Sequence, residues 1–151
     1  MAALITSPRL MSIGGGALAQ LPSLLARLGL ARPLIVTDPY IASCGILEQA
    51  TMLLDKAKVP WAVFSDTVPD PTTEAIAAGV ERLRQDEYDS LVAIGGGSSI
   101  DTAKGMSVLH ANGGQMRDYK VPNEIPRLGP PIIAVPTTAG TGSEVTRFTV
   151  V

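Results

Sequence analysis

A run of three glycines that follows a short apolar segment constrains this chain more than any other feature. Residues 91–94 are all apolar, Gly95, Gly96 and Gly97 follow them, and residues 98–104 read as a helix that begins with two serines. This order predicts a buried strand, a tight turn and the first turn of a helix. Glycine lets a backbone approach a ligand closely, and a helix N-terminus offers unpaired N–H groups to an anion. We therefore expect this turn to bind a phosphate group.

The details of the turn leave the kind of phosphate ligand open. Either Ser98 or Ser99 fits the cap of the helix, and Ser98 with Asp101 fits a capping box. The spacing is not that of G-x-G-x-x-G, and no Lys-Ser or Lys-Thr pair follows the glycines as in a Walker loop. These residues alone predict a phosphate or a pyrophosphate as the ligand. The alternative is a tight turn that binds nothing.

Apolar runs and helical patterns alternate along the rest of the chain. Nearly continuous apolar runs, typical of parallel strands buried on both faces, predict strands over residues 33–38, 61–66, 90–94 and 131–136. Apolar residues at helical spacing predict helices over residues 17–28, 46–57, 72–84 and 99–110. Residues 148–151 read as the start of a further strand, whereas residues 111–130 read as a long loop. The alternation predicts an α/β protein, Rossmann-like and doubly wound, with a mostly parallel sheet covered by helices on both faces.

The composition excludes several classes of protein. The net charge is −2 and no basic run occurs, which argues against binding to nucleic acid or to an anionic membrane. No apolar run approaches the roughly 20 residues that span a bilayer, and residues 1–10 lack the pattern of a signal peptide. Cys44 is the single cysteine, so no internal disulfide forms, and we expect a cytoplasmic protein. We expect one domain over residues 1–151, and a partial one, because the sequence stops within a strand-like run.

Further polar segments follow predicted strands, where open α/β sheets bind their ligands. Asp38 follows the first strand, and a carboxylate there accepts hydrogen bonds from ribose hydroxyls and repels a 2′-phosphate. The alternative for Asp38 is the N-cap of a helix that starts at Pro39. Residues 66–70 follow the second strand, and residues 136–144, rich in hydroxyls and glycine, follow the fourth. This last segment reads either as an anion-binding nest or as a polar turn with Ser or Thr caps.

The remaining reactive side chains fit structural roles. The chain has one histidine, and no His, Cys and carboxylate residues follow the spacing of metal ligands. His110 fits a helix cap or the surface, and Cys44 has no basic neighbour in sequence that would activate it. For Lys104, one turn into the helix after the glycines, we expect a solvated face rather than contact with a phosphate.

Two long motifs carry a resemblance to a known family. Residues 95–104 and 136–146 resemble, in order and in spacing, the motifs of the iron-containing (group III) alcohol dehydrogenases, with support from residues 35–38 and 68–72. The resemblance covers nearly the whole chain. It implies that the chain is the N-terminal nucleotide-binding domain of such an enzyme. It also implies that the helical C-terminal domain, which carries the metal ligands in this family, is absent from the chain.

The resemblance also implies a cofactor and the residues that bind it. The expected cofactor is NAD, and NADP is less favoured because Asp38 is acidic. No catalytic residue and no metal ligand is expected in this chain, so Fe2+ or Zn2+ is expected only in the full-length protein. The residues that match cofactor-binding positions of the family are Asp38 for the adenosine ribose, Gly95, Gly96, Gly97 and Ser98 for the pyrophosphate, and Asp70, Asp101, Thr137, Thr138, Thr141 and Thr146.

The reaction that the resemblance implies is the reversible conversion of an alcohol to an aldehyde or ketone, by hydride transfer assisted by a metal ion. The implied partners are a small alcohol or aldehyde substrate and further copies of the chain, in a dimer or larger homo-oligomer. Maleylacetate reductases and glycerol dehydrogenases of the same superfamily are alternatives, and residues 139–143 favour the metal-dependent branch over the maleylacetate reductases. A non-catalytic nucleotide-binding module is the alternative from another class.

Overall fold

Four parallel strands form the centre of the fold in the computed structural model, which describes residues 8–146 and 149–151. The strands are β1 (Pro33–Val36), β2 (Ala62–Phe64), β3 (Ser90–Gly95) and β4 (Ile132–Pro136). Their order is β2-β1-β3-β4, and each neighbouring pair is parallel. The chain therefore goes from β1 to the edge strand β2, crosses back to β3 on the other side of β1, and then goes to the opposite edge strand β4. The carboxyl ends of β1 and β3 form the switch point of the sheet, where such folds bind ligands.

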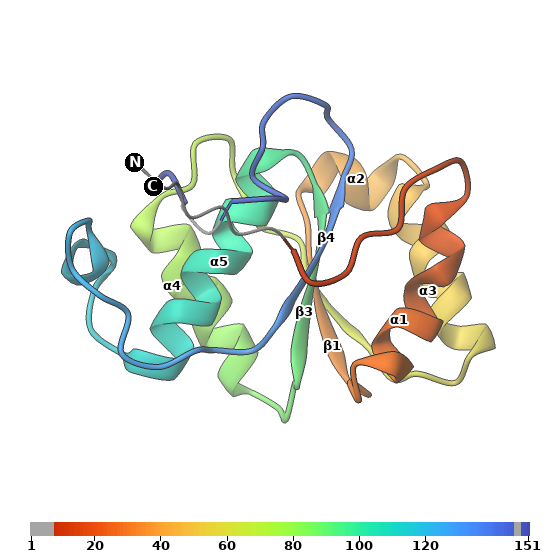
Figure 1. The fold of residues 1–151 in the computed structure, drawn as a ribbon, viewed down its shortest axis with the longest axis horizontal. Helices are drawn as coiled ribbons and strands as arrows, with labels where there is room; N and C mark the ends of the chain where they lie inside the picture. Colours follow the sequence, from red (N-terminus) through yellow and green to blue (C-terminus); the bar gives the residue numbers. More distant parts are fainter. Residues whose placement is uncertain (1–7, 147–148) are drawn as a thin grey trace, which may run out of the picture.

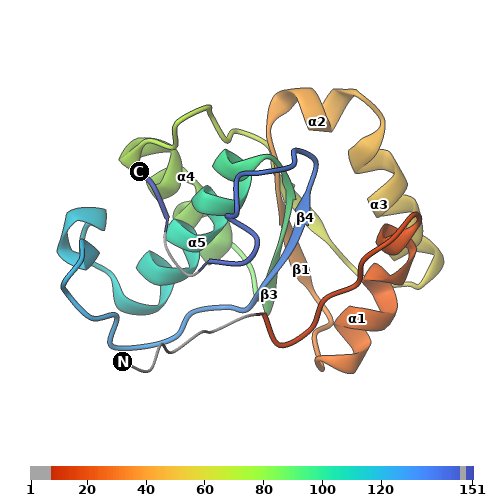
Figure 2. The same cartoon turned by 45° about the horizontal axis from the view of Figure 1, so that its top comes forward.

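Helices cover both faces of this sheet (Figures 1 and 2). One face packs against α1 (Leu21–Arg27), α2 (Pro39–Ser43) and α3 (Ile46–Lys56). The other face packs against α4 (Thr73–Arg84) and α5 (Gly97–Asn112). The segments Ala17–Gln20 and Met116–Tyr119 form 3₁₀ turns. The prediction of a doubly wound α/β fold, with a mostly parallel sheet between two layers of helices, is confirmed.

Alternate residues of the central strands enter two separate apolar cores. Leu34 and Leu91 pack with the side chains of α4 and α5, whereas Ile35 and Val92 pack with those of α1, α2 and α3. All four of these side chains are fully buried. Because β1 and β3 are covered on both faces, their sequences are continuously apolar and show no polar alternation.

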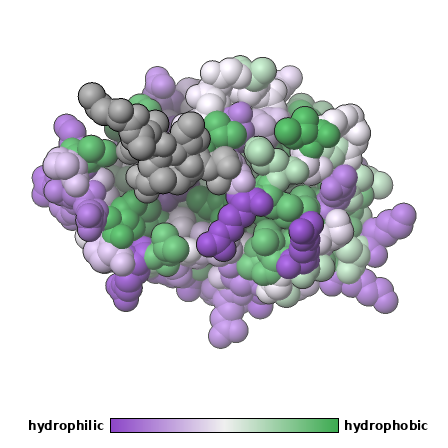
Figure 3. All heavy atoms as spheres, in the orientation of Figure 1, coloured by the Kyte–Doolittle hydropathy of each residue, from purple (hydrophilic) through white to green (hydrophobic). Residues whose placement is uncertain are grey.

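The surface gives no sign of a membrane-spanning element among the described residues, since no helix there is long and apolar enough to cross a bilayer. On the face seen in Figure 1, apolar residues gather toward the middle of the view, and hydrophilic side chains project around the rim and also lie across the middle (Figure 3). The edge strand β4 lies in the middle of that view, and most of its residues are only half-buried.

The helix after the glycine turn begins earlier than predicted. Its N-cap is Gly96, which has an extended backbone, and no side chain caps the helix. The interpretation of Ser98 or Ser99 as the cap, and of Ser98 with Asp101 as a capping box, is therefore wrong. The hydroxyl of Ser99 is turned into the protein, where it lies 3.2 Å from the hydroxyl of Thr67. Local preferences would make Ser99 a cap of the helix, but its hydroxyl instead contacts a residue from a distant segment.

The prediction of a strand over residues 148–151 is also wrong, because residues 149–151 do not form one. Phe148 lies outside the described residues. The hydroxyl of Thr149 donates to the backbone oxygen of Asp101 at 3.1 Å. The N–H of Val150 donates to the Asp101 carboxylate at 3.3 Å. The hydrogen bonds of this segment therefore lead to α5 and not to the sheet.

The loop that follows α5 returns along that helix, and Gly129 makes the closest approach. A Cβ added at Gly129 would overlap the carbonyl oxygen of Ser107 and lie 2.5 Å from its hydroxyl. The same hydroxyl donates to the backbone oxygen of Pro130 at 2.8 Å. The loop is therefore held against α5 by a contact that has no room for a side chain.

We expect Gly129→Ala to lower the free energy of unfolding by about 1–3 kcal/mol, because the loop must move away from a backbone atom. Urea denaturation of the variant measures this change. Gly15→Ala is the matched control, since a Cβ at Gly15 meets no atom within 4 Å, and its stability should change by less than about 0.5 kcal/mol. An equal effect of the two substitutions would contradict the packing of this loop.

Candidate functional site

The glycine turn lies at the carboxyl end of β3, beside the carboxyl end of β1. Gly95 ends β3 with a φ of +154°, a conformation that side chains with a Cβ rarely adopt. A Cβ at Gly95 would overlap the hydroxyl oxygen of Ser99 and lie 3.3 Å from the Asp38 carboxylate. The turn therefore passes directly beside Asp38, as the position of both residues after neighbouring strands predicts.

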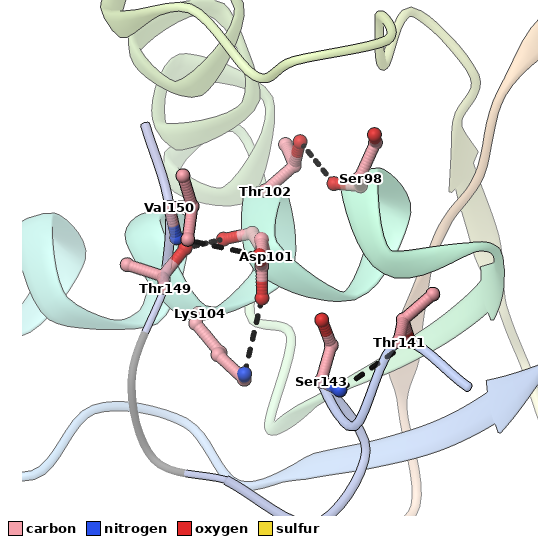
Figure 4. Close-up of polar contacts among 8 residues, drawn as sticks. All are labelled: Ser98, Asp101, Thr102, Lys104, Thr141, Ser143, Thr149 and Val150. Atoms are coloured by element: carbon pink, nitrogen blue, oxygen red, sulfur yellow. Dashed lines mark hydrogen bonds and ion pairs between the residues drawn. The ribbon is translucent and has the colours of Figure 1, made fainter.

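The hydroxyl-rich segment after β4 packs against the same turn. The N–H of Thr137 donates to the backbone oxygen of Gly95 at 2.9 Å. A Cβ at Gly96 would lie 3.1 Å from Thr138 Oγ1. At Gly97 a Cβ would lie 3.3 Å from the Cβ of Thr141 and 3.1 Å from Ser143 Oγ. Figure 4 shows Thr141 and Ser143 beside the start of α5. The two motifs thus form one continuous site, and its glycines make room for hydroxyl side chains of the same chain.

The N-terminus of α5 differs electrostatically from those of α2 and α4. At α2, Asp38 caps the helix, and at α4, Thr72 caps it and Glu74 lies in the first turn. Hydrogen bonds from the helix backbone and from the hydroxyls of Thr72 and Thr73 hold the pKa of Glu74 below its usual value. The first turn of α5 contains no acidic residue and no capping side chain. Its N-terminal dipole is therefore available to an external anion.

A hollow of about 370 Å³ opens at the start of α5. Four residues that the family resemblance assigns to cofactor binding meet in this hollow, although they come from two separate segments. Two of them come from the start of α5, one from its second turn and one from the segment before α4. The lining residues are Asp70, Pro71, Gly97, Ser98, Asp101, Val150 and Val151.

Asp101 is buried and forms the centre of a polar cluster on α5 (Figure 4). Its Oδ1 accepts from Lys104 Nζ at 3.0 Å, and the two side chains are only 10% and 13% exposed. Its Oδ2 accepts from the N–H of Val150. The expectation that Lys104 lies on a solvated face is therefore wrong. Asp101 thus pairs with Lys104 through one oxygen and through the other holds Val150, part of the wall of the hollow, against the helix.

The structure gives Asp38 the N-cap role that we considered as the alternative to ribose binding. Asp38 Oδ1 accepts from the N–H of Ile41 at 2.9 Å, with Pro39 at the first position of α2. The two roles are compatible, because a carboxylate has about four acceptor positions and the cap uses one. Asp38 is half-buried beside the glycine turn, and its contact with a ribose remains a prediction.

The other predicted site residues do not line the hollow, and among them Thr137 and Thr146 have no described contact between their side chains and the glycine turn. Thr137 joins the two motifs through its backbone and its side chain is exposed. Thr146 is exposed and its N–H donates to the backbone oxygen of Gly142 at 3.1 Å. Their roles in cofactor binding stay predictions.

Sequence reasoning missed several residues that build the site. Pro71, Val150 and Val151 line the hollow, and apolar residues in a loop carry no signal of such a role. Thr67 and Ser99, which are 2% and 1% exposed, lie behind Asp38. Thr67 falls in the polar segment that follows the second predicted strand, and this was the only signal that could have found it.

The residues fit a dinucleotide but not a metal ion. The N-terminus of α5, which has no capping side chain, offers donors for a pyrophosphate, and the hollow beside it offers room. Within residues 8–146 and 149–151, no group of three or more His, Cys, Asp or Glu side chains lies close enough together to hold a metal ion. This part of the chain therefore offers no donor set for the metal that the family resemblance implies.

A parallel α/β sheet with a glycine turn and a helix N-terminus at its switch point, and with a hollow at the start of that helix, defines a Rossmann-like domain. The sequence model of the family described as iron-containing alcohol dehydrogenase matches residues 8–151. The chain belongs to the iron-containing alcohol dehydrogenase family.

Curated relatives agree with this family. The NAD-dependent methanol dehydrogenase of Bacillus methanolicus is 40% identical over 139 residues, which are 92% of this chain and 36% of that protein. Alcohol dehydrogenase 4 of Saccharomyces cerevisiae is 35% identical over 144 residues, 95% of this chain and 38% of that protein. The chain thus spans less than two-fifths of the length of these relatives.

Solved structures share the fold. The sulfoacetaldehyde reductase of Bifidobacterium kashiwanohense, solved in complex with NAD+, superposes with a TM-score of 0.85 at 31% identity, over 97% of this chain and 39% of that one. An alcohol dehydrogenase from Oenococcus oeni superposes with a TM-score of 0.85 at 31% identity, over 96% of this chain and 38% of that one.

Proposed function

We propose that this chain supplies the dinucleotide-binding part of an NAD-dependent, metal-dependent alcohol dehydrogenase. The whole protein would interconvert an alcohol and an aldehyde or ketone. The observation that carries the proposal is the N-terminus of α5, which has neither a capping side chain nor an acidic residue in its first turn and borders the hollow. Family membership and the relatives named above support the reaction type.

The residues of this chain bind and orient the cofactor in this proposal. Backbone N–H groups at Gly97 and Ser98 donate to the pyrophosphate, together with the hydroxyls of Thr138 and Thr141. The free acceptor positions of Asp38 bind the hydroxyls of the adenosine ribose. NAD, when bound, accepts the hydride that leaves the alcohol carbon.

The metal ion and the alcohol belong to the rest of the protein in this proposal, because the described residues contain no metal-binding group. The part of the relatives that this chain does not cover is more than three-fifths of their length. We also propose a homo-oligomer, a dimer or larger, as the working form.

Calorimetric titration of the protein as its gene encodes it, with NAD and in parallel with NADP, tests the proposal. We expect binding of NAD at a stoichiometry of one per chain and weaker binding of NADP. If a folded sample binds neither nucleotide, the assignment of the glycine turn as a pyrophosphate site is wrong.

Substitution of Asp38 tests its part in the choice of cofactor. We expect Asp38→Gly to lower the preference for NAD over NADP by about tenfold or more, because hydrogen bonds to the carboxylate are lost and repulsion of the 2′-phosphate disappears. Loss of the α2 cap also affects stability, so a second variant is needed. Asp38→Asn keeps a good N-cap residue but removes the charge. Both variants should change the ratio of the two dissociation constants, and an unchanged ratio in both would exclude the ribose role.

A further inference from the structure

A chain of buried hydroxyl groups leads to the Asp38 carboxylate from inside the protein. Asp38 Oδ2 lies 3.5 Å from Ser99 Oγ, and Ser99 Oγ lies 3.2 Å from Thr67 Oγ1. Ser99 is 1% exposed and Thr67 is 2% exposed. The three residues come from the end of β1, from the first turn of α5 and from the segment between β2 and α4.

The chemistry of these groups fixes the direction of the hydrogen bonds. An ionised carboxylate only accepts, so the single proton of the Ser99 hydroxyl is donated to Asp38. Ser99 then has only acceptor positions left, and Thr67 must donate to it. The order of donation is therefore Thr67 to Ser99 to Asp38. Each hydroxyl polarises the next in such a chain, and this strengthens the bonds in a buried environment.

Two hydrogen-bond donors determine how the Asp38 carboxylate is oriented. The N–H of Ile41 donates to Oδ1 at 2.9 Å, and the Ser99 hydroxyl faces Oδ2 at the longer distance of 3.5 Å. Contacts to both oxygens set the plane of the carboxylate, whereas one contact would leave it free to rotate. About two of its four acceptor positions remain, which suits the pair of hydroxyls on a ribose.

We propose that Ser99 and Thr67 are positioning residues, which hold the Asp38 carboxylate in the plane that a ribose requires and thereby set the preference for NAD over NADP. The inference rests on the ribose-binding role of Asp38 proposed above. Neither residue touches the cofactor in this proposal, since both are buried behind the carboxylate. Thr67 acts only through Ser99.

Titration of NAD and NADP into variants of the whole protein tests this proposal. We expect Ser99→Ala to weaken NAD binding by about 3- to 10-fold, with NADP binding changed by less than about 2-fold, because the loss is confined to ribose recognition. Thr67→Val, which keeps the side-chain shape but removes the donor, should shift the ratio in the same direction by about 2- to 3-fold. Thr67→Ser restores the hydroxyl and should restore the ratio.

The double variant separates positioning from a general loss of structure. Because Thr67 acts through Ser99, adding Thr67→Val to Ser99→Ala should change the NAD-to-NADP ratio no further. Ser107→Ala is the matched control: it removes a hydroxyl that is 8% exposed on the same helix, bonded to Pro130 at 2.8 Å. This control should lower the melting temperature and leave the ratio unchanged.

The outcomes distinguish this inference from the proposed function. A ratio that falls in Ser99→Ala and recovers in Thr67→Ser relative to Thr67→Val supports the inference. If the wild-type protein prefers NAD but Ser99→Ala behaves like Ser107→Ala, the inference is overturned and the proposed function stands. If the folded wild-type protein binds neither nucleotide, the proposed function is overturned and the inference with it.

Discussion

A Gly95→Ala variant is expected to lose about 2–5 kcal/mol of unfolding free energy, the sum of backbone strain and of overpacking. The φ of +154° at Gly95 is nearly exclusive to glycine. The added Cβ would also overlap Ser99 Oγ and lie 2.8 Å from Ser99 Cβ. Because the Asp38 carboxylate lies beside the same position, any shift that relieves the clash also moves the proposed ribose-binding group. We expect NAD affinity to fall by about tenfold or more.

Urea denaturation and calorimetry with NAD measure these two effects. Gly14→Ala is the matched control for the backbone term alone, because Gly14 has a φ of +136° and no atom within 4 Å of an added Cβ. Its expected loss is about 1–3 kcal/mol. If Gly95→Ala is no more destabilising than this control, the close packing of the turn against Ser99 is wrong.

Adding Ser99→Ala to Gly95→Ala separates the cost of steric overlap from the cost of backbone strain. Removing the hydroxyl relieves part of the steric overlap but leaves the strain at φ unchanged. The double variant should therefore be more stable than the sum of the single effects predicts. Strict additivity would indicate that the two residues do not contact each other.

The parts of the fold that could be predicted are those governed by burial of apolar surface. The runs in β1 and β3 are continuous because both faces of these strands are covered, and the helical periodicity in α4 reflects the single face that packs on the sheet. The order of these elements then places Asp38, the glycine turn and the segment after β4 at one edge of the sheet. The site was predictable to this extent, since topology alone brings the segments together.

The errors arise where contacts between distant segments replace local preferences. Serine is a better N-cap than glycine in general, yet Gly96 caps α5 while Ser99 binds Thr67 and Asp38. The spacing of Asp101 and Lys104 is typical of an ion pair, but the sequence does not show that Thr149 and Val150 also contact Asp101. No local sequence pattern predicts that residues 149–150 pack against α5.

The ion pair of Asp101 and Lys104 leads to the other large expected effect. Lys104→Met should lower the free energy of unfolding by about 2–4 kcal/mol, because it leaves the buried Asp101 carboxylate without its cationic partner. Both side chains are nearly buried, at 10% and 13% exposure, so solvent screens the pair only weakly. We expect NAD affinity to fall as well, since Asp101 lines the hollow and holds Val150.

Two comparisons make the test of this ion pair specific. Glu81 and Arg84 on α4 have the same three-residue spacing and lie 2.8 Å apart, but their side chains are 70% and 49% exposed. Arg84→Met should therefore change stability by less than about 1 kcal/mol. Adding Asp101→Asn to Lys104→Met removes the unpaired charge and keeps an acceptor for Val150, so the double variant should be more stable than Lys104→Met alone. If urea denaturation gives the same stability for Lys104→Met and Arg84→Met, the pair is solvent-screened like the exposed one.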